Sequence, residues 1–309
     1  MCFIDHYQVP GNKLHQLCFC TGELVRTDNY FALFKRIFSS RLFEFQEVFI
    51  FKNDGNIEQI NQDVINGLFG MQLEASFNQD TFKKESFDNE LKALAKKLKM
   101  EIKIHYQESK RLKNIAIFVS KETHCLLKLL DAKSSGEIKA NIVVIIGSES
   151  TTSSIAEKFD IPFYHIVHAQ QTDAENEILD ILDRYNVDLI VLGRYMRILT
   201  PNFVWRYPDR IINVHPSLLP AFPGAYAYVQ AYERGAKIVG CTAHFVTEDL
   251  DQGPIICQES FRVRPQDSVQ SIRSRGQKLE AVTLLEAVTL FLEDRIEVNW
   301  GRVVEKHKK

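Results

Sequence analysis

The sequence lacks an excess of charge of either sign. Its 309 residues include 38 lysines and arginines and 40 aspartates and glutamates, so the formal net charge at pH 7 is only −2. A surface that binds nucleic acid or an anionic membrane needs clustered positive charge, usually with a basic excess. We therefore expect neither a nucleic acid nor a membrane among the partners of this protein.

Long hydrophobic runs are missing as well. The longest apolar runs, such as Ile142 to Ile146, are far shorter than the roughly 18–20 residues that a helix needs to cross a bilayer. Met1 to Gly11 has no basic segment followed by an apolar stretch, so we expect no secretion signal and a cytoplasmic location.

Cysteine is sparse and scattered. The six cysteines lie at positions 2, 18, 20, 125, 241 and 257, and no two of them form a C-x-x-C pair. Structural zinc sites usually show such pairs, so we expect no metal and reduced thiols. With 45% hydrophobic and 25% charged residues, the composition excludes a disordered, collagen-like or disulfide-scaffold protein.

The length and one polar segment indicate two domains. A domain usually has about 100–200 residues, and Gln107 to Lys113 is polar and charged except for Leu112. We expect a linker in this segment, with one domain over residues 1–108 and a second over residues 112–309.

The first domain alternates short strands with two helical segments. Asp28 is a candidate N-cap for the helix around Tyr30–Phe38, and Asn53 to Asn56 is a turn signal. The resulting order β-α-β-β-α-β is that of a ferredoxin-like α+β unit. The other predicted elements are strands at Leu14–Cys20, Leu42–Lys52, Gly67–Phe77 and Glu101–Tyr106, and a helix at Phe87–Leu98.

The second domain has short, uninterrupted runs of apolar residues that are separated by amphipathic helices. Such runs are typical of buried parallel strands, and this alternation predicts a doubly wound, Rossmann-like α/β fold. Sheets of this kind bind ligands beyond the carboxyl ends of their strands. The predicted strands are Ile115–Val119, Ile142–Ile146, Leu189–Leu192 and Ile211–Val214, and the helices are His124–Ala132, a segment around Ile178–Leu182, and Gln277–Leu292.

Polar side chains gather at two strand ends of this domain. Asn213 and His215 are two residues apart, so they share one face of a strand that Pro216 ends. His244 lies on another strand, and the acidic turn after it includes Asp251. An Asn, a His and an Asp brought together suit acyl-transfer chemistry, since amide and imidazole donate to an oxyanion and a carboxylate accepts a proton from water. The alternatives are a backbone-satisfied histidine and a solvated acidic loop.

The two segments together resemble the signature of enzymes that use 10-formyltetrahydrofolate. They read Asn213-x-His215-Pro-Ser-Leu-Leu-Pro-x-Phe-x-Gly224 and His244-Phe-Val-Thr-x-x-Leu-Asp251-x-Gly253-Pro254. The segments beginning at Phe118 and Gly193 resemble the deformylases of this family in particular, and the first domain resembles their ACT domain. The family implies hydrolysis of 10-formyltetrahydrofolate to formate and tetrahydrofolate, which supplies formate for purine synthesis and balances the one-carbon folate pools.

The resemblance also implies roles for individual residues. Asn213, His215 and Asp251 correspond to the catalytic residues, with no metal and no cofactor beside the folate substrate. His124 and His244 are candidates for lining the water pocket; helix capping or packing explains His124 equally well, and a core histidine is the favoured interpretation of His244. The residues that match the folate-binding positions are Leu192, Arg194, Met196, Arg197, Ile198, Leu199, Thr247, Asp249 and Gly224.

One physical argument favours water over a ribonucleotide as the acceptor. A transferase that formylates a ribonucleotide must bind phosphate, commonly at a glycine-rich turn from the first strand into its helix. The corresponding turn, Val119 to Cys125, has no glycine, and Glu122 within it repels anions. No G-x-S-x-G segment suggests a covalent acyl-enzyme.

The sequence departs from the deformylases at several positions. Pro216 and Ser217 follow His215 as in the transferases, and the second apolar strand is followed by Gly147-Ser148-Glu149. A formyltransferase for an amine, or an inactive folate- or amino-acid-binding regulator, therefore stays an alternative. The Asp-x-x-Gly turn of ACT domains is absent around Thr21–Asp28. Two roles therefore stay open for the first domain: it binds an amino-acid effector, or it only holds a homo-oligomer (dimer or tetramer) together.

Overall fold

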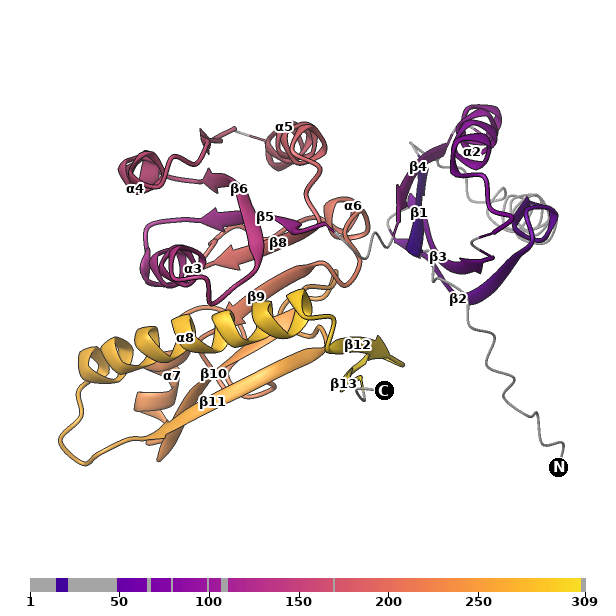
Figure 1. Cartoon of the computed structure of the whole chain (residues 1–309). Coiled ribbons are helices and arrows are strands. Elements are labelled where there is room, and N and C mark those ends of the chain that lie inside the picture. Colours follow the sequence, from indigo (N-terminus) through magenta and orange to yellow (C-terminus); the bar gives the residue numbers. More distant parts are fainter. Residues whose placement is uncertain are drawn as a thin grey trace, which may run out of the picture. The chain divides into compact units, whose positions relative to one another are not determined.

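The computed structural model describes residues 15–21, 49–65, 68–78, 80–98, 100–106, 111–168 and 170–306. The chain divides into two compact units, residues 1–110 and 111–309 (Figure 1). In the described part of the chain, no helix is both long and apolar enough to span a membrane.

Among the described residues, the first unit contains a four-stranded antiparallel sheet with a helix packed on it. The strand order is β2-β3-β1-β4, from β1 (His15–Thr21), β2 (Gly55–Ile65), β3 (Leu68–Phe77) and β4 (Met100–His105). Helix α2 (Lys84–Leu98) precedes β4. This order fits the predicted ferredoxin-like unit. The predicted helix around Tyr30–Phe38, its cap Asp28 and the turn at 22–28 lie outside the described residues.

The second strand of this unit lies later in the chain than the sequence predicts. Residues 49–52 of the predicted strand 42–52 are helical, residues 42–48 lie outside the described part, and β2 begins only at Gly55. The Asn53 side chain donates a hydrogen bond of 2.9 Å to the carbonyl of Phe49, which closes the helical turn. Ile50 is fully buried within this turn, so its hydrophobicity reflects core packing rather than a strand.

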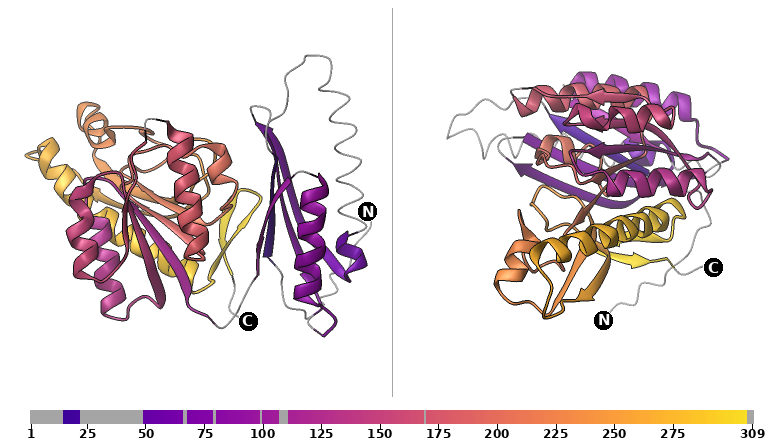
Figure 2. Two further views of the ribbon diagram at one scale, coloured as in Figure 1. Left: turned by 90° about the horizontal axis from the view of Figure 1, so that it is seen from above. Right: turned by 90° about the vertical axis from the view of Figure 1, so that its left-hand side faces the viewer.

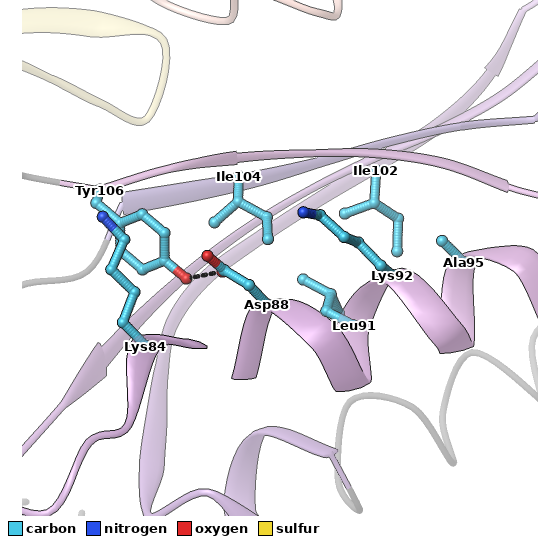
Figure 3. Close-up of a pocket in the computed structure, with 8 residues that line it drawn as sticks. All are labelled: Lys84, Asp88, Leu91, Lys92, Ala95, Ile102, Ile104 and Tyr106. Atoms are coloured by element: carbon cyan, nitrogen blue, oxygen red, sulfur yellow. Dashed lines mark hydrogen bonds between the residues drawn. The ribbon is translucent and has the colours of Figure 1, made fainter. Parts of the chain in front are cut away.

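The core of the first unit is formed by aromatic and aliphatic side chains from α2 and the sheet. Phe87 and Leu91 of α2 are buried against Leu73 and Phe77 of β3. A pocket of about 410 Å³ lies between α2 and β4, and the Lys84 and Lys92 side chains line it (Figure 3).

The second unit contains a seven-stranded sheet of order β11-β10-β9-β8-β5-β6-β7. Strands β5 to β9 run parallel to one another, whereas β10 is antiparallel to both β9 and β11. The strands are β5 (Lys113–Val119), β6 (Ala140–Gly147), β7 (Phe163–His165), β8 (Leu189–Gly193), β9 (Ile211–His215), β10 (Ile238–Phe245) and β11 (Ile255–Arg262).

Helices cover both faces of this sheet (Figures 1 and 2). Ile115 and Ile117 of β5 pack in one apolar cluster with α3, α4 and α8, whereas Ala116 and Phe118 pack on the opposite face with α5 and α6. This alternation of side chains confirms the predicted doubly wound α/β fold. The helices are α3 (His124–Ser134), α4 (Ser153–Lys158), α5 (Gln171–Arg184), α6 (Pro201–Val204), α7 (Ala227–Glu233) and α8 (Val269–Leu292).

The predicted strands and helices of the second unit all occur, and further elements lie between them. Beside α4, α6, α7, β7 and β11, the structure has a 3₁₀ turn, η2 (Ser150–Thr152), and, after α8, a hairpin of β12 (Ile296–Asn299) and β13 (Arg302–Glu305). These additional elements are mostly short, so their hydrophobic patterns span too few residues to indicate a period.

Candidate active site

The candidate active site begins with two side chains at the carboxyl end of β9. Asn213 and His215 lie two residues apart on this strand, and β10 pairs antiparallel with it, so that His244 lies opposite Asn213 and Thr242 opposite His215. The apolar residues Ile211 and Ile212 bury the beginning of β9 and so fix its position in the sheet.

His244 is hydrogen-bonded on both ring nitrogens. Its Nδ1 is 2.8 Å from the carbonyl oxygen of Phe245, and its Nε2 is 3.3 Å from Nδ2 of Asn213. Burial lowers the pKa of His244 below its ordinary value, although the Phe245 carbonyl and Asp251 act in the opposite direction. A neutral ring that donates from Nδ1 presents a lone pair at Nε2, so it accepts a hydrogen bond from the Asn213 amide. His244 therefore fixes which way that amide points.

Asp251 is brought to the same place by the turn after β10. Its Oδ2 lies 3.2 Å from Nδ1 of His215, and its Oδ1 lies 3.9 Å from Nε2 of His244. The backbone N–H of Gly224 donates a hydrogen bond of 2.9 Å to Oδ2. The side chains of both Asp251 and His215 are only 6% exposed. The four predicted residues Asn213, His215, His244 and Asp251 therefore form one cluster.

The surroundings of Asp251 favour its charged form. Burial by itself raises the pKa of this carboxyl group, but the hydrogen bonds from His215 and Gly224 and the nearby imidazole of His244 lower it, and the net direction is downward. The second ring nitrogen of His215, Nε2, is 3.1 Å from the carbonyl oxygen of Phe222. Both ring nitrogens of His215 thus lie within hydrogen-bond distance of an acceptor oxygen.

Tight backbone packing holds the turn that carries Asp251. Asp251 has a left-handed backbone with φ of 57°. A Cβ atom added to Gly253 would lie 1.8 Å from the carbonyl oxygen of Phe245, so only glycine fits at this position. The N–H of Phe245 donates to the carbonyl of Pro254 at 2.9 Å, which closes the turn.

The loop after β8 combines buried and exposed side chains. Leu192 and Leu199 are buried, whereas Met196 and Ile198 are 65% and 66% exposed. The backbone N–H of Met196 donates to Ser120 Oγ at 3.0 Å, which ties this loop to the end of β5. The exposed apolar side chains give the loop a surface on which a flat ring system can pack.

Of the other predicted folate-binding residues, Gly224 lies in the loop between β9 and α7, and the rest lie on this loop or on the turn after β10. Arg197 donates to the carbonyl of His168 at 3.3 Å, and its buried Nη1 has no hydrogen-bond partner within the described ranges. The Thr247 hydroxyl donates to the carbonyl of Asp249 at 3.3 Å. Arg194 is held by carboxylates: its Nε donates to Glu122 at 3.0 Å and lies 3.5 Å from Glu280.

His124 lies in a different cluster from Asn213. Its Nε2 is 3.1 Å from Oε2 of Glu280 on α8. Ligand atoms of His124, Cys125 and Glu280 lie within 4.8 Å of one another, as in a metal site. However, Arg194 already lies 3.5 Å from the same Glu280 oxygen, and its positive charge disfavours a cation there. The described residues of this cluster therefore do not suit a metal ion.

Two groups that contact the predicted histidines were not predicted from the sequence: Glu280 beside His124 and the Phe222 carbonyl beside His215. The signal for Glu280 is a single acidic residue on an otherwise uncharged buried stripe of α8, formed by Ile272, Gly276, Glu280 and Leu284. A charged side chain in such a stripe is rarely buried unless it is paired, so Glu280 indicates a nearby side chain of opposite charge or a hydrogen-bond donor. The Phe222 carbonyl has no comparable signal, because only the course of the loop brings it to His215.

Comparison with known proteins assigns the segment that carries this cluster to a known family. Residues 113–288 match the formyl transferase family, and this segment contains Asn213, His215, His244 and Asp251. A solved structure of glycinamide ribonucleotide transformylase 1 from Symbiobacterium toebii is similar to the chain with a TM-score of 0.61 and 33% identity, covering 66% of this chain and 97% of that one.

Other relatives extend over both units. Formyltetrahydrofolate deformylase of Bacillus subtilis is 39% identical over 261 residues, which cover 83% of this chain and 86% of the relative. A crystal structure of a formyltetrahydrofolate deformylase from Pseudomonas syringae matches with a TM-score of 0.63 and 30% identity, covering 96% of this chain and 95% of that one. The chain therefore belongs to the formyl transferase family, in its branch of formyltetrahydrofolate deformylases.

Proposed function

We propose that this protein hydrolyses 10-formyltetrahydrofolate, with water as the acceptor, to give formate and tetrahydrofolate. The observation that carries the proposal is the 3.2 Å contact between Asp251 and His215 beside the oriented amide of Asn213, in a chain related to formyltetrahydrofolate deformylases. This set contains a proton acceptor and two hydrogen-bond donors, which is what the attack of water on a formamide requires.

Each residue has a distinct role in this proposal. Asp251 takes a proton from the attacking water, and it is suited to this role because its lowered pKa keeps it ionised at neutral pH. Asn213 donates to the oxygen of the tetrahedral intermediate, and His215 donates to it once its Nε2–H turns from the Phe222 carbonyl toward the substrate. When the C–N bond breaks, His215 gives a proton to N10 of the folate and the formyl carbon leaves as formate. The exposed Met196 and Ile198 support the pterin ring.

Formate release tests this function. Purified protein is incubated with 10-formyltetrahydrofolate without any amine, and formate is measured over time. We expect wild type to release formate and Asp251→Asn to lose most of the turnover, because the amide cannot accept the proton of water. Asp180→Asn, the same change at an exposed position of α5, is the matched control and should keep wild-type turnover.

A second candidate function is formyl transfer to an amine. It is favoured by Pro216 and Ser217 after His215 and by the likeness to the transformylase structure. This alternative would be excluded if the protein releases formate without an amine and if added amines neither accelerate the release nor yield a formylated product.

We further propose that the first unit mediates a homo-oligomer, a dimer or tetramer, in the cytoplasm. Of the strands that the structure describes in this unit, β2 and β4 form the two edges of the sheet, and sheet edges pair readily with another chain. Light scattering of the purified protein tests the assembly. A change of formate release on adding amino acids would identify an effector, and its absence would leave assembly as the role of this unit.

A further inference from the structure

A buried cluster of charged side chains lies at the turn from β5 into α3. Its centre is Glu280 of α8, which has no exposed surface. Oε2 of Glu280 is 3.1 Å from His124 and 3.5 Å from Arg194, and its Oε1 accepts a hydrogen bond of 2.6 Å from the Tyr228 hydroxyl. Four parts of the second unit, α3, α7, α8 and the loop after β8, therefore meet at one carboxylate.

A second carboxylate, Glu122, completes the cluster from the turn itself. It accepts a hydrogen bond of 3.0 Å from Arg194 and is also paired with Arg273 of α8. Burial raises the pKa of Glu122, but the two guanidinium groups lower it, and the net direction is downward. One nitrogen of each arginine, Nε of Arg194 and Nη2 of Arg273, is thus directed at a carboxylate of this chain.

The position of the cluster is that of a phosphate site in many α/β proteins. The turn after the first strand of a doubly wound sheet presents backbone N–H groups and the positive end of a helix dipole to a phosphate. Two guanidinium groups at such a place would strengthen the site, since arginine forms strong hydrogen bonds with phosphate. Here Nε of Arg194 and Nη2 of Arg273 lie against Glu122, Glu280 lies beside Arg194, and both carboxylates add negative charge.

We propose that Glu122 and Glu280 determine acceptor specificity by excluding phosphorylated amines from the turn between β5 and α3, which leaves water as the acceptor. The inference rests on the proposed hydrolysis and extends it to the choice of acceptor. The chain's own carboxylates take the place that a phosphate would fill: Glu122 pairs with both Arg194 and Arg273, and Glu280 lies beside Arg194.

Direct phosphate binding tests this proposal. Inorganic phosphate and ribose 5-phosphate are titrated by calorimetry into wild type, Glu122→Gln and Glu122→Gln/Glu280→Gln. We expect the double variant to bind both anions at least about tenfold more tightly than wild type, a difference of about 1.4 kcal/mol, and formate release of this variant to become sensitive to both. Glu286→Gln removes a charge from the exposed face of the same helix and should behave as wild type.

The outcomes separate this proposal from the proposed function. Equal anion binding by wild type and both variants overturns the exclusion of phosphate, whether or not wild type releases formate. Absence of formate release by wild type overturns the proposed function and is measured on the same preparation. Glu280 is buried, so circular dichroism checks the fold of the double variant. If the double variant does not fold, the single variant Glu122→Gln decides the question, because Glu122 is partly exposed. We then expect a smaller gain in anion affinity, and no gain at all would overturn the proposal.

Discussion

Asn213 and His244 face each other across the pairing of β9 with β10, and Nδ2 of Asn213 lies 3.3 Å from Nε2 of His244. The second hydrogen of the same amide nitrogen remains available to a substrate. His244, which donates from Nδ1 to the Phe245 carbonyl, thus orients the Asn213 amide. The register between β9 and β10 places the two side chains opposite each other.

Replacing Asn213 by alanine should reduce kcat for formate release by about 10²–10³, because one donor to the oxyanion is lost. KM should change little, since the interaction forms mainly in the transition state. His244→Gln should reduce kcat less, because the glutamine side chain still offers an acceptor to the amide. Steady-state kinetics of both variants tests this. A rise in KM with kcat unchanged would place Asn213 in ground-state binding instead.

His244 should make the stability of the second unit depend on pH. Burial lowers its folded-state pKa, so between about 6.5 and that lower value the unfolded chain binds a proton that the folded chain does not. The neutral ring of His244 therefore makes its full contribution to the free energy of unfolding above a pH of about 6.5. As the pH falls below this value, the contribution decreases by up to about 1.4 kcal/mol per pH unit.

Urea unfolding at several pH values measures this contribution. The His244→Gln variant is the control, because its side chain does not titrate. The free energy of unfolding should fall more steeply with acidification in wild type than in the variant. Identical slopes would show that His244 has the same pKa in the folded and unfolded chains.

The regular elements around this site could be predicted because their signals are local. Bare apolar runs at Ile115–Val119 and Ile211–Val214 indicated buried strands, and the alternation of Asn213 with His215 placed both on one face of β9. The contact of His215 with Asp251 depends on a turn whose course is set by Gly253 and its close approach to β10. Such long-range packing carries no sequence period, so only the family resemblance indicated it.

The same limit explains the error in the first unit. Phe49 and Ile50 are apolar because they fill the core, and within a short segment this pattern does not distinguish a strand from a helical turn. Strand β2 contains several Asn, Gln, Glu and Asp residues, so its intrinsic strand propensity is low, and pairing with β3 decides its conformation.

Gly253→Ala should weaken both stability and turnover. The added Cβ would lie 1.8 Å from the Phe245 carbonyl oxygen, so the turn must move, and overpacking of this kind costs about 1–3 kcal/mol. Because Asp251 is two residues away, its contact with His215 should lengthen and kcat should fall. Gly193→Ala, whose Cβ would meet only ordinary contacts of 3.4 Å or more, should cost less stability by thermal unfolding. Equal losses in the two variants would contradict this account of the turn.

Leu91→Ala should destabilise the first unit specifically. Leu91 has no exposed surface and packs with Phe87 in the core between α2 and the sheet, so its truncation should cost about 2–5 kcal/mol. Lys96→Ala, on the exposed side of the same helix, is the matched control and should have little effect. The two units have separate cores, so calorimetry should show a lowered transition for the first unit while the transition of the second stays in place. A joint downward shift of both transitions would instead mean that the two units unfold as one cooperative body.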